Sequence, residues 1–233
     1  MFTFKTFIGI PTVRRDESFW ESMDSFIPAL KEECEVEVCI VKNKTIAEAR
    51  NEIASRFLDS DADFLLFLDD DHSGHTIEMF DAILDPLVNN NAYMCGIKCY
   101  TKVFPYCSNI LIYSGADEKK LGLQEGSGKY MPIDLDNGYM YVDLVGFGMT
   151  LLSRKAFSII EPPYFFSQDV NGRSCREDNY FCDKLNKMGI KPVGCFKYTL
   201  THNGIDGVMA RQLRDEGMNR LREKFPDMKV LVS

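Results

Sequence analysis

The first hundred residues alternate between short apolar runs and amphipathic runs. Apolar, β-rich runs cover residues 4–10, 36–41, 64–68 and 92–100. Between them, apolar residues recur at helical spacing over 17–32, 46–57 and 77–87. Strands that alternate with helices in this way form a mostly parallel sheet joined by right-handed crossovers. We therefore expect an α/β fold built on such a sheet.

The second half of the chain is less regular. Gly, Pro and Ser interrupt residues 101–140, which predicts loops and antiparallel hairpins. Beyond them we expect strands over 139–150 and 191–196, helices over 153–160, 177–188 and 207–225, and a polar loop over 167–176. No repeat, low-complexity linker or composition break divides the sequence. A single domain over residues 1–233 is the simplest organisation.

Charge and apolar content exclude several classes of protein. Acidic residues number 35 and basic residues 27, for a net charge of −8. A protein that binds nucleic acids in general presents a basic face to the phosphates, so we expect no general nucleic-acid binding. No apolar run reaches the roughly 20 residues that span a bilayer, so we expect no transmembrane segment and a cytoplasmic protein. The eight cysteines form no CxxC pair and are expected to be reduced and mostly buried.

Three adjacent carboxylates follow the apolar run 64–68 directly: Asp69, Asp70 and Asp71. Ligands of open α/β sheets bind beyond the carboxyl ends of the strands. Adjacent carboxylates repel one another, and a hard divalent cation would offset that repulsion by binding their oxygens. The alternative is an acidic loop that caps the next helix. The strand-end position and the Asp69-x-Asp71 spacing favour the metal.

Three further groups have both a catalytic and a structural interpretation. Glu177 and Asp178 open a predicted helix, where acidic residues are common without any catalytic role. His202 follows the last predicted strand, yet a lone histidine more often has a structural role. Arg50 and Asn51 lie on a predicted helix, and from the residues alone a solvent-exposed face is the simpler interpretation.

Taken together, these pieces resemble a glycosyltransferase of the GT-A fold, similar to the inverting family 2 group. The resemblance extends to about residue 205 and rests on an ordered set of motifs rather than on any single one. The set, in chain order, is Pro11-Thr12, Ala49-Arg50-Asn51, the DxD element Asp69-Asp70-Asp71, the run 146–154, Glu177-Asp178 and His202. It implies a single GT-A domain with a nucleotide-sugar-binding half (1–100), an acceptor-side half with a small antiparallel part (101–205) and a C-terminal helix (206–233).

The resemblance also implies roles for individual residues. Those that would bind a nucleotide-sugar donor are Pro11, Thr12, Arg50, Asn51, Asp69 and Asp70. Those that would hold Mn²⁺ or Mg²⁺ are Asp69, Asp71 and His202. Asp178 would be the general base of the catalytic pair. Glu177, its other member, would cap the helix or pair with Arg173 or Arg176.

The function implied by the resemblance is metal-dependent transfer of a sugar, most simply from a UDP-sugar, to an acceptor hydroxyl with inversion. The segment 41–45, Val-Lys-Asn-Lys-Thr, stands where family 2 members often carry an acidic Asp-Gly-Ser element that reads the base. The acceptor stays open among a glycan, a lipid, a protein and a modified base. Two other functions also stay open: a nucleotidyltransferase of similar nucleotide-binding fold, and a non-catalytic module that binds a nucleotide or a glycan.

Overall fold

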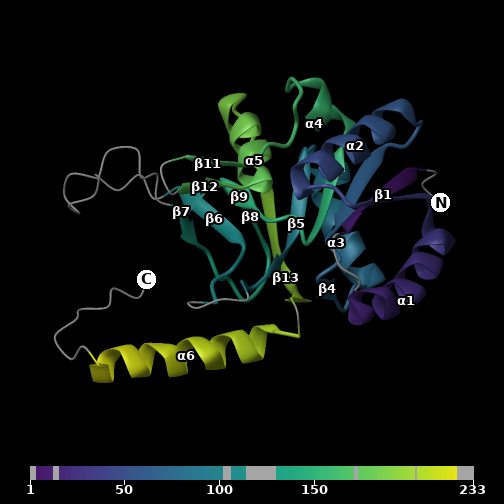
Figure 1. The fold of residues 1–233 in the computed structure, drawn as a ribbon. Coiled ribbons are helices and arrows are strands. Elements are labelled where there is room, and N and C mark those ends of the chain that lie inside the picture. The colour runs from purple at the N-terminus through teal and green to yellow at the C-terminus, as the bar shows by residue number, and fades with distance from the viewer. Residues whose placement is uncertain are drawn as a thin grey trace.

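The computed structural model describes residues 4–12, 16–101, 106–113, 130–170, 173–202 and 204–224 of the 233-residue chain. Its centre is an eight-stranded sheet flanked by helices (Figure 1). Seven of the strands lie in the order β2 (Glu35–Lys42), β1 (Lys5–Thr12), β3 (Phe64–Leu68), β10 (Met149–Ser153), β5 (Met94–Cys99), β13 (Val193–His202) and β4 (His72–Ser73). The eighth, β8 (Tyr139–Tyr141), pairs with β13.

The sheet is mostly parallel, as the alternation of strands and helices predicts. Strand β1 pairs in parallel with β2 and β3, and β13 pairs in parallel with β5. Strand β10 runs antiparallel between β3 and β5. A separate antiparallel sheet contains β7 (Tyr130–Pro132), β6 (Ile110–Tyr113) and β9 (Leu144–Val145). The predicted fold class, α/β with a small antiparallel part, is confirmed.

Helices cover both faces of the central sheet and bury two apolar layers against it. Figure 1 shows α1 (Glu17–Glu33) and α3 (Ile77–Asn89) together on one side. On the other side lie α2 (Ile46–Asp59), α4 (Arg154–Ser158) and α5 (Glu177–Lys187). The first layer is built on apolar side chains such as Phe26 and Phe80, and the second on Phe57 and Phe181. Burial of such side chains removes apolar surface from water and holds the sheet as a rigid platform.

Helix α2 begins at a capping box, which fixes its direction. The Thr45 hydroxyl accepts the backbone N–H of Glu48 at 3.3 Å, and the Glu48 carboxylate accepts the backbone N–H of Thr45 at 3.0 Å. These two reciprocal hydrogen bonds satisfy donors that would otherwise lack a partner at the helix start. The helix then buries Ala49, Arg50 and Ile53 on the side that faces the sheet.

Several predicted elements differ from the structure. The prediction of a single strand over 139–150 is wrong, because this segment contains three strands, β8, β9 and β10, which belong to two different sheets. The loop predicted over 167–176 is a hairpin of β11 (Gln168–Val170) and β12 (Arg173–Cys175). The strand predicted over 191–196 continues to His202, which therefore lies in β13 rather than after it. Helix α6 (Gly207–Lys224) matches the predicted C-terminal helix. Among the helices that the structure describes, none has the length and apolar character that crossing a membrane would require.

Candidate active site

A cavity of about 940 Å³ lies at the edge of the central sheet where several strands end. Strands β1, β3, β5 and β13 all point their carboxyl ends towards this edge, because they are parallel in one sheet. This edge is where open α/β sheets bind ligands. The described lining side chains include Pro11, Arg50, Asp69, Asp70, Asp71, His72, Cys99, Tyr100, Asn109, Phe147, Ser167, Arg176, Glu177, Asp178 and His202.

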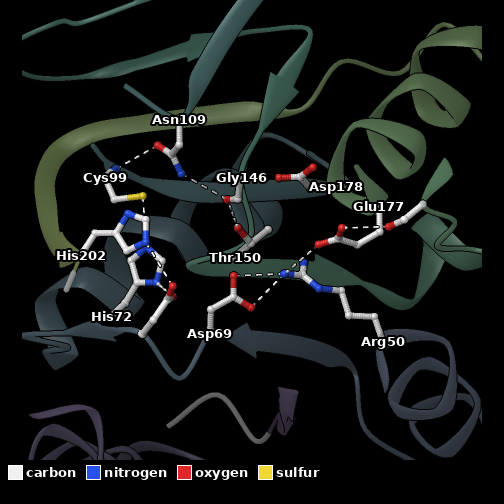
Figure 2. Close-up of polar contacts among 12 residues, drawn as sticks. Arg50, Asp69, His72, Cys99, Asn109, Gly146, Thr150, Glu177, Asp178 and His202 are labelled. Carbon is white, nitrogen blue, oxygen red and sulfur yellow. Dashed lines mark hydrogen bonds and ion pairs between the residues drawn. The ribbon is translucent and has the colours of Figure 1, made fainter. Parts of the chain in front are cut away.

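At one end of the cavity, the acidic turn after β3 meets the end of β13. Strand β4 immediately follows the turn and pairs antiparallel with β13, so that His72 lies opposite His202. The two imidazole rings stack with centroids 4.2 Å apart (Figure 2). Asp71 contacts both of them, with Oδ1 at 2.8 Å from His72 Nδ1 and Oδ2 at 3.1 Å from His202 Nε2. Burial favours a higher pKa for Asp71, but its hydrogen bonds with His202 and His72 prevail and hold that pKa well below its usual range.

The contact between Asp71 and His202 indicates that these two side chains could bind a cation. His202 Nδ1 lies 2.8 Å from the backbone oxygen of Tyr100, which can only accept a hydrogen bond. Nδ1 therefore carries the ring proton, and the lone pair of Nε2 faces a carboxylate oxygen. His202 Nε2 and Asp71 Oδ2 would then be two acceptors in contact, which repel each other. A second proton on the ring or a bound cation would remove that repulsion. The donor set of carboxylate and imidazole fits a divalent metal ion, and Asp69 and Asp71 also form a possible metal-binding group with His72.

Arg50 connects the acidic turn with the start of α5. Its Nη2 lies 2.8 Å from Asp69 Oδ1, 3.0 Å from Asp69 Oδ2 and 3.5 Å from Glu177 Oε1 (Figure 2). The guanidinium also lies over the ring of Phe147, 4.6 Å from its centroid. Arg50 is only 2% exposed, so its interpretation as part of a solvent-exposed helix face is wrong. Its Nε and Nη1 atoms are buried and have no hydrogen-bond partner among the described residues.

The surroundings of Asp69 make it easy to protonate. Burial is the main cause that raises its pKa to about 7, and the charges of Asp71, Glu177 and Asp178 add to it. Arg50 acts in the opposite direction by stabilising the charged carboxylate. Asp69 is therefore held between one buried cation and several other acids, a condition that often marks a functional site.

Glu177 and Asp178 open α5 and face different neighbours. The Glu177 carboxylate lies near Arg50 and accepts a hydrogen bond from the Ser167 hydroxyl at 3.3 Å. Figure 2 shows the Asp178 carboxylate turned instead towards the Gly146 side of the cavity. Burial and the charge of Glu177 raise the pKa of Asp178. Arg50 is thus one cation that contacts Glu177, while the side chain of one predicted partner, Arg173, lies outside the described residues.

The predicted donor-binding residues do not all reach the cavity. Pro11 and Asp70 line it, and the Thr12 hydroxyl donates a hydrogen bond to Asp70 Oδ2. Asn51 is different: its amide donates to the backbone oxygen of Phe165 at 2.6 Å and accepts the backbone N–H of the same residue at 3.1 Å. Asn51 is absent from the described cavity wall, so the structure gives it a supporting role.

Several residues of the cavity wall were not predicted from the sequence. His72 and Cys99 lie beside His202, with His72 Nε2 at 3.3 Å from Cys99 Sγ. The Asn109 side chain accepts the backbone N–H of Cys99 at 2.8 Å and so holds the end of β5. Gly148 lets the backbone approach His72, since a Cβ atom there would lie 2.7 Å from the ring Nε2. Only the position of His72 next to the acidic triplet was visible as a signal in the sequence.

Comparison with known proteins shows similarity at the level of the fold. No family model and no curated protein sequence matches the chain. The structure is similar to that of A197 from STIV, with a TM-score of 0.59 and 17% sequence identity over 86% of this chain and 85% of that one. The fold is GT-A. This GT-A chain is also similar to glucosyl-3-phosphoglycerate synthase from Mycobacterium tuberculosis, solved with Mn²⁺, UDP-glucose and phosphoglyceric acid. That second superposition is looser, with a TM-score of 0.46 and 13% identity over 94% of this chain and 79% of the synthase.

Proposed function

We propose that the protein is a metal-dependent glycosyltransferase that transfers a sugar from a UDP-sugar to an acceptor hydroxyl with inversion. The observation that carries the proposal is the contact of Asp71 Oδ2 with His202 Nε2 at 3.1 Å, inside the main cavity of a GT-A fold. The two residues are 131 positions apart, and the backbone oxygen of Tyr100 orients the imidazole towards the carboxylate. A carboxylate and an oriented imidazole together form the kind of ligand pair that holds a divalent ion.

The metal is the first part of the proposed mechanism. Asp71 and His202 would hold Mn²⁺ or Mg²⁺, with Asp69 on the same cavity wall. When bound, the ion would neutralise the negative charge that grows on the departing nucleoside diphosphate. Asp69 already shares its charge with Arg50, so we assign it a contact with the donor rather than the main ligand role.

Arg50 supports the assignment of a phosphorylated donor. It lines the cavity, and its Nη2 contacts the carboxylates of Asp69 and Glu177. A guanidinium at the cavity wall attracts phosphate oxygens, which supports a diphosphate donor. Pro11 and the Thr12–Asp70 pair would border the nucleobase. The cavity volume of about 940 Å³ is within the range of small-molecule sites.

Asp178 is the proposed general base. Its raised pKa makes the ionised carboxylate a stronger proton acceptor, which suits the removal of a proton from an acceptor hydroxyl. Glu177 is the less suitable acid, because Arg50 and Ser167 already engage its carboxylate. In the proposed step, the acceptor oxygen forms the new bond to the anomeric carbon and its proton passes to Asp178. The bond to the diphosphate oxygen breaks on the opposite face, which inverts the anomeric centre.

The test is turnover with a panel of sugar nucleotides in the presence of Mn²⁺ or Mg²⁺. The proposal expects slow release of a nucleoside diphosphate from at least one donor without acceptor, and its abolition by EDTA. Asp183→Asn is a suitable control, because Asp183 lies on α5 in a surface ion pair with Lys187 and should leave turnover unchanged. Binding of a donor without any product release would favour a non-catalytic module, and release of pyrophosphate from a nucleoside triphosphate would favour a nucleotidyltransferase.

A further inference from the structure

Strand β2 forms one edge of the central sheet. Its eight residues pair in regular register with β1 on one side, and no described strand pairs with it on the other. In a parallel pair, alternate residues turn their backbone N–H and C=O groups away from the neighbouring strand. No other backbone group of the described chain hydrogen-bonds to these outward groups of β2. The edge can therefore accept a further strand.

The side chains of β2 leave apolar surface exposed at this edge. Val36 packs against the apolar layer beneath α1. Val38 and Ile40 lie on the same face of the strand as Val36, because side chains alternate, but they are 39% and 37% exposed. On the other face, Cys39 and Val41 are buried in the layer beneath α2. The exposed apolar side chains thus lie on the one strand that has an open side.

A cavity of about 630 Å³ lies at the same edge. Its described wall includes four consecutive residues of β2, 37–40, and residues 59–61 at the end of α2. A groove lined by an edge strand and the end of a helix leaves room beside the strand for another extended chain.

The charges of β2 favour one kind of partner. Glu35 and Glu37 lie in its first half, and Lys42 ends it. Opposite charges across two strands stabilise the pair, and like charges destabilise it. A second β2 strand that ran parallel would bring acidic residues beside acidic residues. An antiparallel copy instead brings the acidic start of each strand to the basic end of the other, so β2 is complementary to a reversed copy of itself.

We propose that two copies of the chain pair through β2, antiparallel and related by a two-fold axis, so that their central sheets join into one. Closed two-fold dimers are the commonest oligomers. Residues directly opposite each other in antiparallel strands have side chains on the same face. With Cys39 on the axis, Val38 of each copy lies opposite Ile40 of the other, and the two pairs cover all four exposed side chains. The dimer is independent of the proposed function, because no β2 residue belongs to the described wall of the active-site cavity.

The test is the mass of the full-length protein by size-exclusion chromatography with light scattering, at about 1–100 μM, where complexes with a micromolar Kd dissociate. We expect the mass of two chains at the upper end of this range. Ile40→Lys should weaken the dimer at least about tenfold, because both apolar cross-strand pairs are lost. Val88→Lys is the matched control, because Val88 is 48% exposed on α3, which packs on β5, and the dimer should remain. Val38→Lys replaces Ile40→Lys if that variant does not fold.

An exchange of charges tests the antiparallel order. Lys42→Glu should weaken the dimer, because it makes both ends of the strand acidic, and the addition of Glu35→Lys to the same chain should strengthen it again. The proposal is overturned if the wild type is a monomer throughout the range, which would leave the edge to a different partner. It is equally overturned if folded Ile40→Lys dimerises like the wild type, or if the double variant dimerises no better than Lys42→Glu.

Discussion

Removal of the Arg50 side chain should destabilise the protein strongly, although Arg50 lies on a helix with other polar residues. Arg50→Ala deletes the cation that contacts Asp69 at 2.8 and 3.0 Å and Glu177 at 3.5 Å. It also deletes the contact of the guanidinium with the ring of Phe147. The two carboxylates then remain partly buried without their shared counter-charge.

The magnitude follows from the burial of the three groups. Loss of one partner from a buried ion pair typically costs about 3–5 kcal/mol. The side chains of Asp69 and Glu177 are 22% and 14% exposed, and the cavity admits solvent, so we expect the lower end, about 3 kcal/mol. Part of this loss should be recovered at low pH. Asp69 has a pKa of about 7 even beside Arg50, so a protonated Asp69 no longer needs the cation.

Urea unfolding of wild type, Arg50→Ala and Arg56→Ala at pH 8 and pH 5 measures the effect. Arg56 lies on the same helix but is 56% exposed, and its surface pair with Glu52 should contribute at most about 0.5 kcal/mol. We expect the Arg50→Ala penalty to be several times the Arg56→Ala penalty at pH 8 and to shrink at pH 5. Equal penalties for the two variants would refute the buried network.

Three further predictions follow from the cavity wall. Gly148→Ala should cost about 1–3 kcal/mol in urea unfolding, because the new Cβ atom would lie 2.7 Å from the His72 ring; an unchanged stability would show that the ring moves freely. Asp178→Asn should lower turnover at least about a hundredfold while donor affinity, measured by calorimetry, stays nearly the same; normal turnover would remove Asp178 as the base. Relative to Asp69→Asn, the wild type should lose stability as pH rises from 3.8 to about 7, because the folded state binds the Asp69 proton more tightly than the unfolded state; parallel pH profiles of the unfolding free energy would contradict this.

The local sequence pattern was sufficient to predict the helices and strands of the first half of the chain. The apolar run 64–68 is strand β3 with the same bounds, and the helices predicted over 17–32 and 46–57 correspond to α1 and α2. These features depend on neighbouring residues, so they are visible in the sequence. The insertion of β10 antiparallel between β3 and β5 is not a local property, because it depends on which strands pair. Residues 139–150 were misread for this reason: Gly146 and Gly148 pack against Asn109 and His72, and the chain changes sheets between them.

The candidate site shows the same limit. The acidic triplet and His202 were found from the sequence because their residue types and order are informative by themselves. The burial of Arg50 was not predicted. A helix face that is exposed to solvent and a helix face that packs against acidic residues can have the same local sequence. The participation of His72 and Cys99 depends on the pairing of β4 with β13 and of β13 with β5, which places both beside His202. No spacing in the sequence predicts that His72, Cys99 and His202 lie together.

We expect that a divalent ion held by Asp71 and His202 is required for the protein to bind a nucleoside diphosphate. Calorimetric titration with UDP tests it most directly, in Mn²⁺ and in EDTA, for wild type and Asp71→Asn. We predict that wild type binds UDP in Mn²⁺, that EDTA abolishes the binding, and that Asp71→Asn loses it while remaining folded by circular dichroism. UDP binding of equal affinity in EDTA, or in the Asp71→Asn variant, would show that the ion is not required.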